Sequence, residues 1–136
     1  MVAKLRLFAG FVVMAAATAL ALPPAAAQTP PTVASVGADL QVFCVAGANG
    51  LVADEAACLS AVARALSTAN AHAALGQVGP QVDIGALVGQ IMVNFPALAQ
   101  QVIDLVNSSG NAAVALGVSN SLGPNWVGPR PIVSPA

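Results

Sequence analysis

Residues 82–107 read VDIGALVGQIMVNFPALAQQVIDLVN, and no other part of the chain carries so long a regular apolar pattern. Its large apolar side chains recur at alternating steps of four and three residues, at Ile84, Val88, Ile91, Phe95, Leu98, Val102 and Leu105. Residues three and four apart lie on the same face of an α-helix. The pattern therefore predicts helix with one continuous apolar face, against which the other segments pack.

Pro96 lies in the middle of this stretch. Proline lacks an amide hydrogen and clashes with the carbonyl four residues earlier. Either one helix kinks at Pro96, or two helices, about 82–94 and 96–107, meet there with Pro96 in the first turn of the second. The four-three spacing continues through the proline and slightly favours one kinked helix. The residue before a proline disfavours helical geometry, so the second interpretation stays open.

The same stretch contains G-x-x-x-G at Gly85 and Gly89. Two glycines four residues apart on a helix let another backbone approach closely. With the seven apolar residues they define a candidate helix-packing face, used either inside the monomer or against another chain. Residues 84–103 carry no charge and are long enough to span a bilayer. Spanning is opposed by amides that are costly to bury in hydrocarbon: Gln90, Asn94, Gln100 and Gln101.

The N-terminus has the features of an export signal. Lys4 and Arg6 precede an uncharged apolar run at 7–22, and three alanines ending at Ala27 offer a cleavage site. The alternative is an uncleaved anchor, for which the run is short, since a span needs about 20 residues. We expect residues 1–27 to be a signal peptide, and the mature protein to begin near Gln28 and to be periplasmic or secreted.

The mature chain is one small, alanine-rich domain with few charges. Arg64 and Arg130 stand against five acids, a net charge of −3, and no lysine remains; the acids are Asp39, Asp54, Glu55, Asp83 and Asp104. So few basic residues can neutralise few phosphates, which argues against nucleic-acid binding. The chain also lacks the polybasic patch that would hold it to an anionic membrane.

Cys44 and Cys58 are the two cysteines. In an exported protein such a pair is expected to form a disulfide, which here closes a loop of about 15 residues and contributes roughly 3 kcal/mol. The alternative is a redox or metal pair. The spacing is not C-x-x-C, and no further cysteine or neighbouring histidine completes a zinc site.

The fold class predicted is all-α, a small bundle of three to five helices with one disulfide and extended, proline-containing tails. Residues 28–37 are expected to be an extended leader, because Pro30 and Pro31 interrupt them. The helical domain is placed at 38–122. Residues 38–46 suit strand by propensity, but with no partner strand we favour a short helix. Further helices are predicted at 52–71 and 112–122, and a proline-rich extended tail at 123–136, with Trp126 folded back as an apolar lid.

Candidate chemistry is sparse. His72 is the only histidine and could act only if Asp39 or Asp104 approached it in space; otherwise it is a polar residue at a helix end. His72 with Met92 could ligate haem, although methionine in a helix is usually core filler. Asn107-Ser108-Ser109 matches a glycosylation sequon that also suits a helix terminus. We therefore expect no catalytic residue, no metal site and no cofactor, and do not expect an enzyme.

The leading hypothesis is a non-enzymatic exported protein that acts by helix packing with a protein partner or with itself. One alternative is a carrier that holds a small apolar ligand in a cavity at Pro96. The other is a membrane-active protein that uses the uncharged segment 84–103, although membrane contact is not favoured. A covered apolar face at 84–105 would make it core, and an exposed one would make it a binding surface.

Overall fold

The computed structural model describes residues 29–132, which form five α-helices and two short 3₁₀ turns. This confirms a small all-α bundle. The signal peptide predicted at 1–27 lies outside the described residues. In chain order the elements are α3 (Val33–Phe43), η1 (Ala48–Gly50), α4 (Glu55–Ala74), α5 (Val78–Asn94), η2 (Pro96–Leu98), α6 (Ala99–Ser109) and α7 (Ala112–Leu122).

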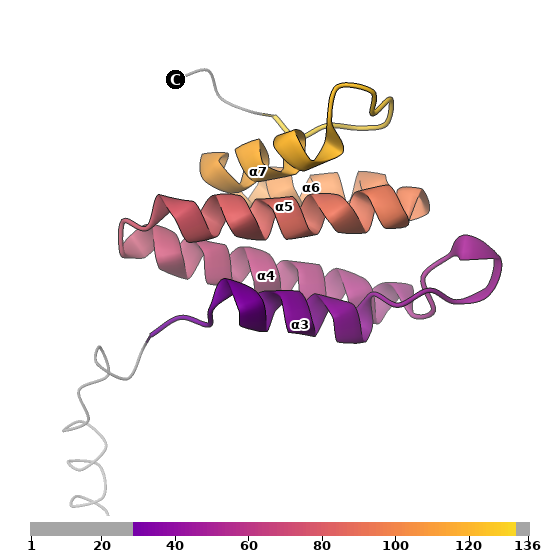
Figure 1. The fold of residues 1–136 in the computed structure, drawn as a ribbon, viewed down its shortest axis with the longest axis horizontal. Coiled ribbons are helices and arrows are strands. Elements are labelled where there is room, and N and C mark those ends of the chain that lie inside the picture. Colours follow the sequence, from indigo (N-terminus) through magenta and orange to yellow (C-terminus); the bar gives the residue numbers. More distant parts are fainter. Residues whose placement is uncertain (1–28, 133–136) are drawn as a thin grey trace, which may run out of the picture.

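Helix α5 is the centre of the bundle and contacts all four other helices. Figure 1 shows α3 and α4 side by side on one side of it and α7 on the other, with α6 behind. The apolar residues of 82–107 thus have neighbours on several sides. The expectation that the remaining segments gather around this stretch is confirmed.

The first helix begins earlier than the sequence indicated. Residues 33–37 were assigned to an extended leader, but they form the first turns of α3. Thr32 explains the difference, because its hydroxyl oxygen accepts a hydrogen bond from the Ser35 amide at 3.1 Å and caps the helix. Val36 and Leu40 are buried on the inner face. The helical domain therefore starts at Val33 and not at residue 38.

Helix α4 starts at Glu55, three residues after the predicted start at 52. The Asp54 carboxylate accepts a hydrogen bond from the Ala57 amide at 3.0 Å and caps this helix. Cys58, Val62 and Leu66 follow one another at four-residue steps and lie on its buried face.

The chain breaks at Pro96, so the single kinked helix is wrong. Phe95 has φ −131° and ψ 73°, outside helical geometry, and Pro96 opens the short turn η2 that leads into α6. Across this break the direction of the chain changes by 113°. The four-three spacing survives because α5 and α6 turn their apolar sides towards the same core, not because the helix is continuous.

The described part of the chain contains no single helix long and apolar enough to cross a bilayer; only α5 taken together with residues 96–109, across that bend, reaches the required length and composition.

Helices α5 and α7 pack backbone to backbone through glycines. A Cβ built on Gly85 would overlap the carbonyl oxygen of Val114, and one built on Gly117 would overlap that of Val82. A Cβ on Gly89 would come within 2.7 Å of the Ser121 side chain. Glycine lowers helix propensity, yet Gly117 inside α7 is what allows this close approach.

The segment after α7 has no helix or strand up to residue 132, and it doubles back on itself (Figure 1). The Trp126 indole nitrogen donates to the Pro129 carbonyl at 2.9 Å, and the Arg130 guanidinium donates to the carbonyls of Gly123 and Trp126. Trp126 is partly buried against the core. The apolar lid predicted from the sequence is therefore present, on a folded loop instead of a fully extended tail.

Candidate functional site

The candidate helix-packing face is mostly interior. Gly85 and Gly89 are buried against α7, and Leu105 is the one member only partly buried. The remaining members are all buried: Ile84, Val88, Ile91, Phe95, Leu98 and Val102. By the criterion set from the sequence, this covered face is core and offers little surface to a partner.

Cys44 and Cys58 form the predicted disulfide. It joins the residue that ends α3 to the first turn of α4, across 4.6 Å between Cα atoms. Both cysteines are buried, Cys58 completely. This burial and the absence of free cysteine among residues 29–132 indicate a structural bridge, of the kind found in a non-reducing, exported setting.

His72 lies in the last turn of α4, and only 7% of it is exposed. Its Nδ1 faces the Gln77 side-chain oxygen at 2.6 Å, and its Nε2 faces the Pro31 carbonyl at 2.9 Å. Both ring nitrogens are therefore occupied by neighbours that hold the N-terminal segment and the α4–α5 corner in place. The predicted neighbours Asp39 and Asp104 are not its partners.

The structure gives no support to a metal or haem site. Within residues 29–132, no three His, Cys, Asp or Glu side chains lie close enough together to hold a metal ion. Met92 is fully buried in α5, where it fills the core.

Among the described residues, four large apolar side chains are exposed close together in the sequence, where the chain leaves α3 and enters the disulfide-closed loop. We call this group the apolar end; its members and exposed fractions are Val42 (64%), Phe43 (39%), Val45 (44%) and Leu51 (53%). Figure 1 shows that this loop projects beyond the ends of the helices. A surface at these residues was not predicted from the sequence.

The loop of the apolar end is held by its own backbone. Ala46 and Val52 form an antiparallel bridge, the Gly47 amide donates to the Leu51 carbonyl at 2.6 Å, and the Ala53 amide to the Val45 carbonyl at 2.8 Å. Asn49 turns the chain at φ 59°, a backbone conformation that asparagine tolerates better than most residues. These bonds and the disulfide fix the loop, so little conformational freedom remains to be lost on binding.

An ionic contact fixes the base of the apolar end. The Arg64 guanidinium donates to both carboxylate oxygens of Asp39, at 3.1 and 3.2 Å, and thereby links α4 to α3. Its central carbon also lies 5.1 Å from the centre of the Phe43 ring, within cation–π range. Phe43 is therefore held in one position although it is partly exposed.

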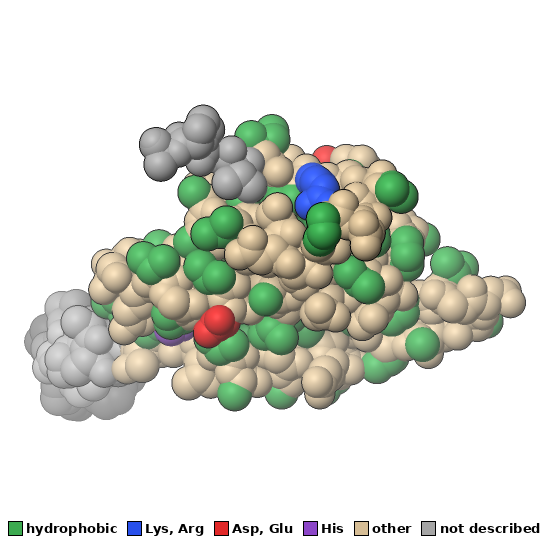
Figure 2. Space-filling model, turned by 45° about the horizontal axis from the view of Figure 1, so that its top comes forward, with side chains coloured by type: hydrophobic (Ala, Val, Ile, Leu, Met, Phe, Trp, Pro, Cys, Tyr) green, Lys and Arg blue, Asp and Glu red, His purple; other side chains and the backbone are tan. Residues whose placement is uncertain are grey.

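The surface around these features carries little charge. Residues 40–53 contain no ionisable group except the bonded Cys44. Figure 2 shows hydrophobic side chains scattered over one face of the molecule with very few charged atoms between them. This agrees with the sequence, in which residues 28–136 carry only seven charges.

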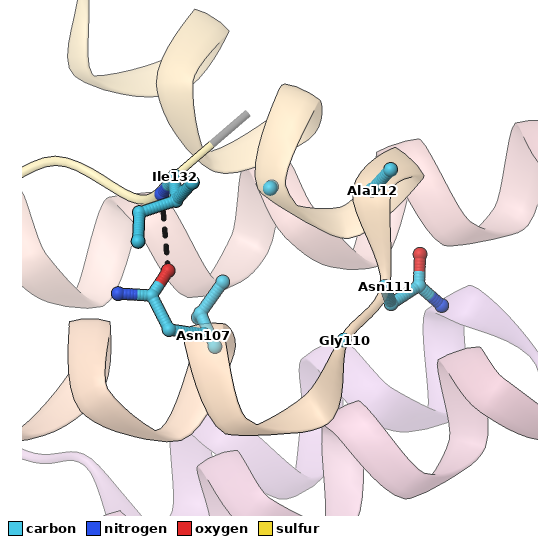
Figure 3. A pocket seen from close by; sticks show the side chains of 7 residues that line it. Asn107, Gly110, Asn111, Ala112 and Ile132 are labelled. Atoms are coloured by element: carbon cyan, nitrogen blue, oxygen red, sulfur yellow. Dashed lines mark hydrogen bonds between the residues drawn. The ribbon is translucent and has the colours of Figure 1, made fainter. Parts of the chain in front are cut away.

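A small pocket lies between the end of α6, the start of α7 and Ile132, with a volume of about 180 Å³. In Figure 3 the Asn107 side chain points towards Ile132, whose amide donates to Asn107 Oδ1 at 3.0 Å, whereas Asn111 points away. Asn111 instead caps α7 and donates to Asn70 at 2.9 Å. These polar groups already serve the fold, so the pocket is a poor candidate for a ligand.

Comparison with known protein families, with curated proteins and with solved structures gives no match to this chain.

Proposed function

We propose that this chain is an exported, non-enzymatic protein that binds another protein through the apolar end. One observation carries the proposal: four large apolar side chains remain substantially exposed, two at the end of α3 and two on the adjoining loop, which is braced by a disulfide and by its own hydrogen bonds. A loop this small could have turned polar residues outward. Exposed apolar patches of a few hundred Å² commonly mark interaction sites.

The size of the patch bounds the strength of binding. Four such side chains, each about half exposed, present roughly 300 Å² of apolar surface, whereas a stable interface buries roughly 800 Å² per partner. Polar neighbours must therefore supply the rest of the contact. Burial of the patch alone contributes about 7 kcal/mol before the entropy of association is subtracted. We accordingly propose a moderate, reversible complex.

The alternative functions lose the observations that motivated them. A carrier was expected to have space at Pro96, but the neighbouring Phe95 and Leu98 are buried in the core there. A membrane-active role was built on residues 84–103, whose apolar side chains are mostly covered by the other helices. The apolar end supports binding of a protein partner. This proposal requires neither a cavity at Pro96 nor an exposed segment 84–103.

Site-specific photo-crosslinking in the exporting cell tests the proposal. A photo-reactive phenylalanine analogue at position 51 or 42 should give one discrete protein adduct. The same analogue at Ala74, an exposed residue at the far end of α4, should not. Introducing Val45→Asp alongside position 51 should abolish the adduct, because it places a charge in the contact. Equal labelling from position 74, or an adduct insensitive to Val45→Asp, would refute the proposal.

A further inference from the structure

A second surface lies on another part of the bundle, between α4 and α6. It is a groove of about 390 Å³ lined by Leu59, Ser60, Ala63, Gln101, Asp104, Leu105 and Ser108. The residues of α6 are spaced three and four apart, so they form one stripe along the helix. From residue 101 to 108 this stripe runs for about 10 Å, which is two turns of a helix.

The groove is where the apolar core reaches the surface. Leu105 is the last member of the predicted packing face, and it is only partly buried, as is Leu59 opposite it. Three other lining residues, Ser60, Ala63 and Ser108, have small side chains. Small residues among larger apolar ones let a third helix approach both α4 and α6.

One charge borders the groove. Asp104 is exposed and accepts a hydrogen bond from the Gln100 side chain at 3.0 Å. In the described part of the chain the only ion pair is that between Arg64 and Asp39, so Asp104 has no cationic partner there. A molecule that lies in the groove can therefore place a positive charge beside Asp104.

Residues 28–136 of a second copy offer no free cationic side chain to Asp104. Arg64 is engaged with Asp39, and Arg130 donates to the carbonyls of its own loop. No lysine follows residue 4. We propose that the α4–α6 groove binds an amphipathic helix of a different protein, with leucine-like side chains in the groove and a lysine or arginine against Asp104. This surface is independent of the apolar end.

The proposal can be tested with two labelled peptides of about 18 residues, since shorter isolated helices are marginal in water. Both carry the same leucine face; one has lysines on the polar face and the other glutamates. Fluorescence anisotropy with the disulfide-bonded mature chain should show binding of the lysine peptide. Asp104→Asn should weaken it about fivefold, the effect of one exposed ion pair. Asp83→Asn, on α5, is the matched control and should change nothing.

A variant that blocks the groove distinguishes binding in the groove from nonspecific electrostatic binding of the lysine peptide. Ala63→Trp fills the groove at an exposed position and should abolish binding, whereas Ala71→Trp on the same helix should not. Circular dichroism checks that both variants fold. Equal binding of the two peptides, or lysine-peptide binding unchanged by Ala63→Trp, overturns the proposal. The proposal is also overturned if light scattering shows a dimer of the mature chain that Ala63→Trp dissociates. Val45→Asp should leave peptide binding intact. Failure of the proposal for the apolar end is thereby distinguished from failure of the proposal for the groove.

Discussion

The closest backbone contact in the bundle gives the sharpest test of the fold. Gly85→Ala and Gly117→Ala each place a methyl group onto a carbonyl oxygen of the facing helix. A flexible side chain could move aside, but these oxygens belong to helical backbone. Helices α5 and α7 must separate or shift, and every apolar contact between them loosens.

Two effects of opposite sign set the magnitude. Overpacking of a well-packed core costs about 1–3 kcal/mol and occasionally more. Replacing glycine by alanine inside a helix recovers roughly 1 kcal/mol of helix propensity. Because the overlap here is with backbone, we place the packing cost at the upper end, and expect each variant to lose about 2 kcal/mol of unfolding free energy.

Gly37→Ala is the matched control. Gly37 also lies inside a helix, α3, but a Cβ there meets only Leu87 Cδ1 at an ordinary 3.6 Å. This variant should gain about 0.5–1 kcal/mol from propensity. Gly89→Ala, which meets the side chain of Ser121, should fall between the two outcomes.

Urea unfolding followed by circular dichroism at 222 nm measures the series. In thermal unfolding of a chain of this size, a change of 1 kcal/mol in the unfolding free energy moves the melting temperature by roughly 4 °C. If Gly85→Ala or Gly117→Ala proves as stable as Gly37→Ala, then α5 and α7 do not meet through their glycines. The packing of the whole bundle around α5 would then have to be revised.

Three further changes test the remaining supports of the fold. Replacing Cys44 and Cys58 together by alanine should lower the unfolding free energy by about 3 kcal/mol, and dithiothreitol should then have no further effect on the melting temperature. His72→Ala removes a buried side chain and the contacts of both its ring nitrogens with the exposed Gln77 and Pro31, and should cost about 1 kcal/mol by urea unfolding; an unchanged midpoint would show that those contacts carry no stability. Asp54→Ala removes the cap of α4 and should cost about 1 kcal/mol, whereas Asp54→Asn, which keeps an acceptor oxygen, should recover most of it.

The helices were largely predictable from apolar spacing, because burial against one core imposes that spacing on each of them. The same spacing gave a wrong prediction at Pro96. There, two helices that face one core show the same four-three spacing of apolar residues as a single continuous helix. The start of α3 was not predicted because Pro30 and Pro31 favour extended backbone. The cap that starts the helix depends on the single hydroxyl of Thr32. Periodicity reports which face is buried, and not where the chain changes direction.

The apolar end was missed for a related reason, although its signal was present in the sequence. Val36, Leu40 and Cys44 follow one another at four-residue steps and are buried. Val42 is two residues from both Leu40 and Cys44, so in a helix it must point to the opposite side. Phe43, Val45 and Leu51 follow within or beside a turn in which Asn49 is the only polar side chain apart from the cysteine. Val42, an apolar residue on the face opposite the buried one, was therefore the feature of the sequence that indicated an exposed apolar surface.

Scarcity of charge links the two proposed surfaces. Residues 28–136 carry five acids and two arginines that are already engaged, so they offer no extended pattern of ion pairs with which to select a partner. Selectivity must come from shape at the fixed apolar end and from the single carboxylate beside the α4–α6 groove. Salt should therefore weaken lysine-peptide binding only slightly, because one exposed pair is screened. Contact at the apolar end should persist or strengthen at high salt, since apolar burial does not depend on screening. A strong loss of the position-51 adduct in 0.5 M sodium chloride would mean that charge, not apolar surface, holds that partner.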